Sequence, residues 1–372
     1  MALTNGDGWA ISSNAWLTVP QAGAWGDDSF GQLDSPAPLT NLVAVAAGAY
    51  HSLALRADGT VLAWGYNDHG ECDPPPTLGD AIAIAADGYH SLAISARNTV
   101  VAWGANDSGQ TDVPANLAGV IAIAAGTWHS LALRADGTLV GWGDNTWGQI
   151  SIPSGLSGVV AIAAGGHHSV ALKRDGTVVA WGDNTNAQGQ FAGQSIVPPG
   201  LTNVSAIAAG AYFSMAVRSD GSVVAWGDNG QGQCSFPAGL TNVVAVAGGY
   251  GHALALKSSG AVAAWGANWN GQCSVPSFCT NVFAVAAGAY HTLLLLEAPP
   301  ILPQLLTPAR RAGSLSLLVQ SLNRRSYALE FKNTLVETNW TALPAVQGNG
   351  ALRLLTDPDA SVPQRFYRLR QW

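Results

Sequence analysis

The stretch that decides the fold runs from Val43 to Gly65 and reads VAVAAGAYHSLALRADGTVLAWG. Apolar and small residues alternate within its three runs, which is the periodicity of a β-strand rather than of a helix. Asp58-Gly59 lies between the second and third runs, and Asp-Gly readily adopts the positive φ angles of a tight hairpin. The stretch therefore predicts three short strands, of which the last two are antiparallel neighbours.

The same unit recurs along most of the chain. Tryptophans followed by glycine recur every 39 residues, with one step of 45 residues. They are Trp25, Trp64, Trp103, Trp142, Trp181, Trp226 and Trp265. A second series keeps the same spacing and meets the same six-residue insertion: His51, His90, His129, His168, Phe213, His252 and His291. Repeats of this length are too small to bury their own apolar faces, so they indicate a solenoid or a propeller.

The small residues of the first run indicate a propeller. This run consists almost entirely of Val, Ile, Ala and Gly, as in 121–125. Several sheets can converge on one axis only where the side chains are small. The segment Thr111–Pro114 predicts a fourth, outer strand that ends at proline. The segment 283–296 lacks a Trp-Gly strand and 23–26 lacks an inner strand, so the two halves complete one shared blade. The fold class predicted is all-β, with a seven-bladed propeller over about residues 17–297.

Shorter segments flank the predicted ring. Residues 1–16 are expected to form an N-terminal extension, and the proline cluster in 298–312 predicts a stiff linker. Within 313–372, five strand-like runs separated by turn residues predict a small β-sandwich. These runs are Leu315–Val319, Tyr327–Phe331, Trp340–Leu343, Ala351–Leu355 and Arg365–Arg370.

Composition limits the classes of function. The net charge of −7 combines +5 in residues 298–372, where nine Lys and Arg face four Asp and Glu, with −12 in the rest. An acidic ring does not favour nonspecific nucleic-acid binding, which needs a basic surface. No stretch is apolar enough to span a bilayer, and the first twenty residues lack a secretory signal. The sequence leaves open a cytoplasmic location, or an extracellular or cell-surface one if a leader is missing.

The repeat resembles the regulator of chromosome condensation repeat family. The resemblance rests on Ala-Ala-Gly-x-x-His-Ser-Leu-Ala-Leu, followed by Asp-Gly-Thr-Val-x-Ala-Trp-Gly-x-Asn-x-x-Gly-Gln, over about residues 17–297. It implies a seven-bladed propeller closed by a shared blade. The short unit looks most like bacterial members such as β-lactamase inhibitory protein II. Eukaryotic members that exchange nucleotide on a Ran GTPase are similar in fold, with longer repeats and a projecting wing.

Strand direction places two sets of loops on one face of the ring. We call the histidines of the second series the ladder histidines. The residue before each of them is usually aromatic, and Tyr250 is expected to fill the gap at Gly251. The candidate binding residues are Tyr50, Tyr89, Trp128, His167, Tyr212, Tyr250 and Tyr290, with Phe30, Tyr66, Trp147 and Trp269 from the second set of loops. Seven aspartates are interspersed with them and predict an acidic rim: Asp27, Asp28, Asp68, Asp107, Asp144, Asp183 and Asp228.

Gathered aromatic side chains are typical of binding hot spots. In the inhibitor-like relatives, aromatic residues at this loop position contact the partner enzyme, so the resemblance implies the same role here. We therefore expect a monomeric, non-enzymatic protein that binds a protein partner as an inhibitor or a scaffold. A glycan-binding propeller, nucleotide exchange on a small GTPase, and rings that simply cover the inner strands remain alternatives.

The repeated polar residues are expected to be structural. The tryptophans should be buried between sheets, and each ladder histidine should bond a backbone group in its own blade. Equivalent histidines in different blades lie too far apart to share a metal ion, and no cofactor or catalytic residue is indicated. The asparagines after Trp-Gly, such as Asn67, hold a turn position where asparagine tolerates left-handed geometry and bonds the nearby backbone. Unpaired thiols are favoured over a Cys273–Cys279 bridge.

Overall fold

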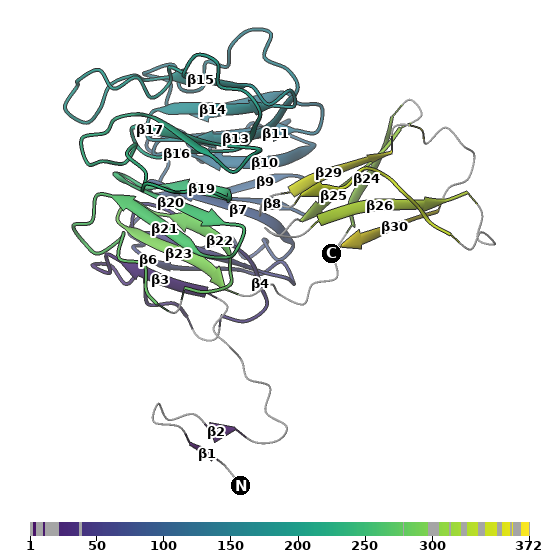
Figure 1. Ribbon diagram of the computed structural model, residues 1–372, viewed down its shortest axis with the longest axis horizontal. Coiled ribbons are helices and arrows are strands. Elements are labelled where there is room, and N and C mark those ends of the chain that lie inside the picture. Colours follow the sequence, from purple (N-terminus) through teal and green to yellow (C-terminus); the bar gives the residue numbers. More distant parts are fainter. Residues whose placement is uncertain are drawn as a thin grey trace.

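The computed structural model describes residues 22–36, 39–277 and 279–296 of the ring region. It also describes the short strands β1 (Leu3–Thr4) and β2 (Ala10–Ile11), and 305–311, 314–320, 326–333, 339–347, 352–357, 359 and 366–371. Most of the expected extension over 1–16 therefore lies outside the described residues. Figure 1 shows the repeated sheets from purple to green and the C-terminal strands in yellow. No helix long and apolar enough for a membrane span occurs in the described part of the chain.

Each repeat forms a three-stranded antiparallel sheet, and seven such sheets make the propeller. The inner strands are β4 (Leu42–Ala47), β7 (Ala81–Asp87), β10 (Val120–Ala125), β13 (Val159–Ala164), β16 (Val204–Ala209), β19 (Val243–Gly248) and β22 (Val282–Ala287). The middle strands are β5 (His51–Arg56), β8 (His90–Ser95), β11 (His129–Arg134), β14 (His168–Lys173), β17 (Phe213–Arg218), β20 (His252–Lys257) and β23 (His291–Leu296). The outer strands are β6 (Val61–Gly65), β9 (Val100–Gly104), β12 (Leu139–Gly143), β15 (Val178–Gly182), β18 (Val223–Gly227), β21 (Val262–Gly266) and β3 (Ala22–Gly26).

The ring closes through a blade shared by two distant segments of the chain. β3 pairs with β23, and the register runs from His291 opposite Gly26 to Leu295 opposite Ala22. Each inner strand contacts the inner strand of the next blade, and β22 contacts β4 in the same way. The predicted shared blade is confirmed, and it leaves no unpaired end in the array.

The predicted fourth strand does not form. In the segment around Thr111–Pro114, the amide of Asp112 donates to the carbonyl of Gly109, and that of Val113 donates to Thr111. Backbone donors that close local turns are not available to a neighbouring strand, and Pro114 has no amide hydrogen. The segment is therefore a sequence of turns at the outer edge of a three-stranded blade.

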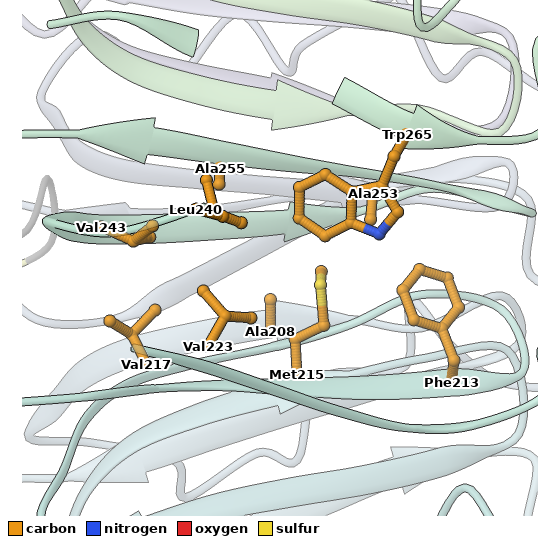
Figure 2. Packing of buried hydrophobic residues seen from close by; sticks show 10 residues of the cluster. All are labelled: Ala208, Phe213, Met215, Val217, Val223, Leu240, Val243, Ala253, Ala255 and Trp265. Atoms are coloured by element: carbon orange, nitrogen blue, oxygen red, sulfur yellow. The ribbon is translucent and has the colours of Figure 1, made fainter. Parts of the chain in front are cut away.

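The hydrophobic core lies between neighbouring blades. Figure 2 shows one such interface, where Phe213 and Met215 of β17 face Trp265 and Ala253 of the next blade. All seven repeat tryptophans are at most 8% exposed, which confirms that they are buried. Burying an indole removes about 150–250 Å² from water. At ~25 cal/mol per Å², each contributes about 4–6 kcal/mol to folding as an upper bound.

The C-terminal strands form two antiparallel sheets. One contains β24 (Leu305–Arg311), β25 (Ser314–Gln320) and β29 (Leu352–Asp357), and the other contains β26 (Ser326–Lys332), β27 (Thr341–Ala342), β28 (Val346–Gln347) and β30 (Phe366–Gln371). Strands occur at all five predicted runs. β24 lies inside the range predicted to be a linker, and its ladder is interrupted between Leu306 and Ala309, next to Pro308. Proline is tolerated there because a bulge on an edge strand needs no ladder donor.

Candidate functional site

The loops of one face are held by the glycine that follows each repeat tryptophan. Gly65 has a φ of 106°, and a Cβ atom at this position would lie 2.6 Å from the carbonyl oxygen of Tyr50. The next amide, that of Tyr66, donates to this carbonyl at 3.0 Å. The turn after the outer strand is thereby fixed against the loop that follows the inner strand. This packing brings the two predicted sets of aromatic residues together on one face.

Seven aromatic residues surround the face end of the central cavity, and we call them the collar: Tyr50, Tyr89, Trp128, His167, Tyr212, Tyr250 and Tyr290. Tyr250 occupies the gap left by Gly251, as the sequence predicted, because its ring lies 5.6 Å from both Tyr212 and Tyr290. All seven collar residues are half-buried. Each collar residue lies in the loop that joins an inner strand to a middle strand, and all but Tyr250 lie just before the residue that starts the middle strand.

The collar continues into a connected aromatic network. Tyr50 contacts Tyr290 at 5.7 Å and Tyr89 at 6.2 Å between ring centroids, and Tyr89 contacts Trp128 at 6.3 Å. Phe30 lies 5.1 Å from Tyr50 in an edge-to-face arrangement, and Tyr66 lies 5.7 Å from Tyr89. Such pairs each contribute about 0.5–1.5 kcal/mol beyond their buried area. The network is therefore a rigid surface rather than a set of independent rings.

Three large apolar side chains at the edge of this face remain open to solvent. Phe30 is 48% exposed, Trp147 is 51% exposed and Trp269 is 57% exposed. Trp269 also contacts Tyr290 of the collar at 6.3 Å. Phe30 and Trp269 thus extend the network of half-buried rings to the solvent, and exposed apolar surface of this kind is uncommon on a surface that faces only water.

The predicted acidic rim is only partly present. Asp28, Asp68 and Asp107 are exposed, whereas Asp183 is only 7% exposed. The other three aspartates are half-buried and accept a hydrogen bond from a buried glutamine five residues later, in the pairs Asp27–Gln32, Asp144–Gln149 and Asp228–Gln233. The loop positions of the aspartates predicted a complete rim because they do not show that these carboxylates accept hydrogen bonds from buried amides.

Burial keeps three of the collar residues uncharged at physiological pH. Burial raises the pKa of Tyr212 and of Tyr290 to about 12 in each case, with neighbouring tyrosines adding to the effect. Burial lowers the pKa of His167 below its usual range, although Asp183 and Asp144 oppose the shift. At neutral pH these three collar residues therefore carry no charge.

The ladder histidines are buried as predicted, but their partners lie in the next blade. His51 Nε2 lies 2.9 Å from Ser91 Oγ, and Ser91 Oγ donates to the carbonyl of Glu71. Because the hydroxyl hydrogen is used in that bond, Nε2 is the donor to the hydroxyl. The indole Nε1 of Trp103 donates to the same carbonyl at 2.9 Å. The prediction of a backbone partner within one blade was wrong. The histidine of one blade bonds the hydroxyl of the residue that follows the histidine of the next blade, as His51 bonds Ser91 next to His90.

The asparagines after Trp-Gly do not adopt left-handed geometry. The positive φ values belong to neighbouring glycines such as Gly65 and Gly70, and Asn67 instead accepts a hydrogen bond from the amide of Cys72 at 2.7 Å. Left-handed asparagines occur in other turns, at Asn41, Asn98, Asn203, Asn242 and Asn281. The glycine already supplies the unusual backbone angle, so the asparagine contributes only its side-chain amide.

The four cysteines are free thiols, so the Cys273–Cys279 bridge does not form. Cys273 Sγ donates to the carbonyl of Ala267 at 3.1 Å, and equivalent bonds occur at Cys72 and Cys234. Burial raises the pKa of Cys273 to about 11. The thiols of Cys72, Cys234 and Cys273 therefore act as half-buried donors to the backbone of their turns.

Sequence reasoning missed two features near the site. Asp87 lines the central cavity at a position where the other six repeats carry glycine. The six-residue insertion exposes Phe191 to 75% and Ile196 to 54%. An alignment of the seven repeats would have found Asp87, because it is the one acidic residue in a column of glycines.

Six segments match the model of the regulator of chromosome condensation (RCC1) repeat: residues 42–71, 81–110, 120–149, 159–188, 204–233 and 243–272. The chain is an RCC1-repeat β-propeller. Each matched segment begins at an inner strand and extends past the Trp-Gly strand, and the shared blade is the seventh blade of the ring. No curated protein sequence matches the chain.

Solved structures share the fold at low sequence identity. Prp20p of Saccharomyces cerevisiae is 18% identical with a TM-score of 0.63, over 75% of this chain and 92% of that chain. Yeast RCC1 (Prp20) with Kap60 bound is 19% identical with a TM-score of 0.62, over 75% and 89%. Human WBSCR16 is 20% identical with a TM-score of 0.62, over 74% of this chain and 100% of that chain. These similarities establish the RCC1-type ring.

Proposed function

We propose that this RCC1-repeat propeller is a non-enzymatic binding protein that docks a protein partner on its aromatic face. The observation that carries the proposal is the aromatic network of the collar, with Phe30, Trp147 and Trp269 open at its edge. Aromatic side chains with few rotatable bonds lose little entropy when a partner orders them, so they dominate the affinity of many interfaces.

The solved relatives add support of a general kind. One report on Prp20p describes its binding properties to Gsp1p and histones, and another structure holds Kap60 bound to the yeast protein. RCC1-type rings thus serve as platforms for proteins. For this chain, the face with the aromatic network is the natural platform because a rigid, half-buried network is already ordered before binding.

The test is affinity capture from the host's lysate and culture medium. The bait is the full chain, compared with a variant that carries Tyr50→Ala, Trp128→Ala and Tyr290→Ala. A Phe236→Ala variant is the matched control, because Phe236 is an exposed aromatic residue (40%) that is not among the ring contacts of the face. We expect one protein to be captured by the wild type and by the control and to be lost with the folded triple variant.

Capture that survives the triple variant would contradict the proposal, since the face would then be packing alone. The wild type and the triple variant also test the two other functions that the sequence leaves open. A glycan-binding propeller would bind carbohydrate on an array through the same rings. A nucleotide exchange factor would accelerate GDP release from a small GTPase.

A further inference from the structure

The central cavity ends at the collar. It has a volume of about 560 Å³, and its wall is formed by the last residues of the seven inner strands and by the loops that follow them. One level of the wall consists of Val and Ile from every blade: Val45, Ile84, Ile123, Ile162, Ile207, Val246 and Val285. Apolar side chains therefore line much of the cavity below an aromatic mouth, while backbone, phenol and carboxylate groups give it comparable polar surface.

Asp87 breaks the sevenfold repetition of this wall. Its equivalents are Gly48, Gly126, Gly165, Gly210, Gly249 and Gly288. In those blades a Cβ atom would collide with the ring of the ladder histidine or phenylalanine, as at Gly48. The blade with Asp87 has a different turn, in which the strand pairing extends to Asp87 opposite His90 and Gly88 takes a φ of 48°.

The Asp87 carboxylate has no cationic counterpart among the residues that line the cavity, which include no Lys or Arg and no other acid. Its Oδ1 accepts a hydrogen bond from the amide of Gly88 at 2.6 Å. A carboxylate in an apolar wall is costly unless a proton or a cation compensates it. Burial accordingly raises the pKa of Asp87 to about 7. The other titratable groups of the wall are the collar phenols and His167, and burial keeps Tyr212, Tyr290 and His167 neutral at this pH.

We propose that the cavity binds an organic ammonium ion, with the ammonium group paired to Asp87, its alkyl chain against the apolar wall and the collar rings around it. A carboxylate combined with the faces of several aromatic rings is the arrangement that recognises alkylammonium groups. The ion has two chemical sources, a free amine or the lysine side chain of a protein. The inference goes beyond the proposed function, because it concerns a ligand inside the ring and stands without a protein partner.

Calorimetric titration of the full chain with hexylammonium tests the inference, with 1-hexanol as the neutral probe of the same length. We expect saturable binding of hexylammonium and at least tenfold weaker binding of hexanol. Asp87→Asn removes the charge, and Asp87→Gly restores the residue that the other six repeats carry. Both variants should weaken hexylammonium at least tenfold, whereas Asp107→Asn on the exposed rim should not.

Affinity for hexylammonium should also be higher at pH 8 than at pH 6, since Asp87 is ionised only above a pH of about 7. Titration with Nα-acetyl-lysine amide separates the sources: equal affinity assigns the site to a protein side chain, and weaker affinity assigns it to a free amine. The inference is overturned if hexylammonium shows no saturable binding, if hexanol binds equally well, or if folded Asp87 variants bind unchanged. Capture of a protein partner by the Asp87→Gly variant tests the aromatic face independently of the cavity.

Discussion

The bond between one blade's histidine and the next blade's hydroxyl is the smallest unit that holds the ring together. Six of the seven blade interfaces contain this bond, and the hydroxyl belongs to Ser or, at Thr292, to Thr. The seventh interface has Phe213 where the histidine would be, and Ala253 where the hydroxyl would be. Figure 2 shows these two residues on the facing sheets. Both polar groups have been replaced together, so neither is left buried without a partner.

This pairing predicts a strong coupling between the two positions. Phe213→His places a buried Nε2 against the methyl group of Ala253, and we expect it to lower the free energy of unfolding by about 1–3 kcal/mol. Adding Ala253→Ser supplies the missing acceptor and should recover most of the loss. Urea unfolding of the wild type, both single variants and the double variant measures a coupling energy of about 0.5–3 kcal/mol. Additive effects would show that the two residues are independent.

At the scale of the element, six of the seven inner strands begin after a turn that requires an unusual backbone angle, and β7, which follows Asp80, is the exception. Asn203, Asn242 and Asn281 have φ values of 56–57° before their inner strands, and Gly119 and Gly158 occupy the same position with 68° and 69°. A Cβ atom at Gly119 or Gly158 would meet nothing within 4 Å. The residue type is therefore selected by the backbone angle and not by the available space.

Substitutions at Asn242 test that explanation. Asn242→Ala should lower the free energy of unfolding by about 1–2 kcal/mol, since a left-handed angle costs this much for a residue with a Cβ atom. Asn242→Gly should be close to neutral, because glycine adopts the angle without strain. Thermal unfolding of both variants provides the comparison. If the alanine variant is as stable as the glycine variant, the amide side chain and not the angle explains the asparagine.

The elements also show which features the sequence can predict. The strands of the blades could be predicted because Trp-Gly, Asp-Gly and alternation act within a few residues. The prediction of a fourth strand at Thr111–Pro114 was wrong because the backbone amides of this segment donate to local turns. The partner of His51 was missed because Ser91 lies 40 residues away in another blade. The collar residues could be placed from strand direction, whereas Asp87 required a comparison of the repeats with one another.

At the scale of the whole molecule, the ring excludes protons from its histidines. Burial lowers the pKa of His51, His90, His129, His168 and His252 to about 3, and that of His291 to about 4. An unfolded histidine has a pKa of about 6.5. Between these values the unfolded chain binds more protons than the folded ring, so stability falls as the pH is lowered. Asp87 opposes this trend weakly, because its pKa is raised.

We therefore expect the free energy of unfolding to decrease from pH 7 to pH 5, with uptake of more than one proton. Urea unfolding at several pH values gives the number of protons from the slope. The variant His168→Phe with Ser214→Ala copies the Phe213–Ala253 interface and should reduce the slope by about one proton. Stability that is constant over this range would mean that the histidines do not titrate on unfolding.

The shared blade has a mechanical consequence. In the antiparallel pair of β3 and β23, Ala22 lies opposite Leu295, so the start of β3 and the end of β23 meet at one edge of the sheet. A force that separates these two points loads the ladder one hydrogen bond at a time instead of all bonds at once. The ring would thus be peeled open from this blade under tension, while the six blades made from continuous chain remain intact.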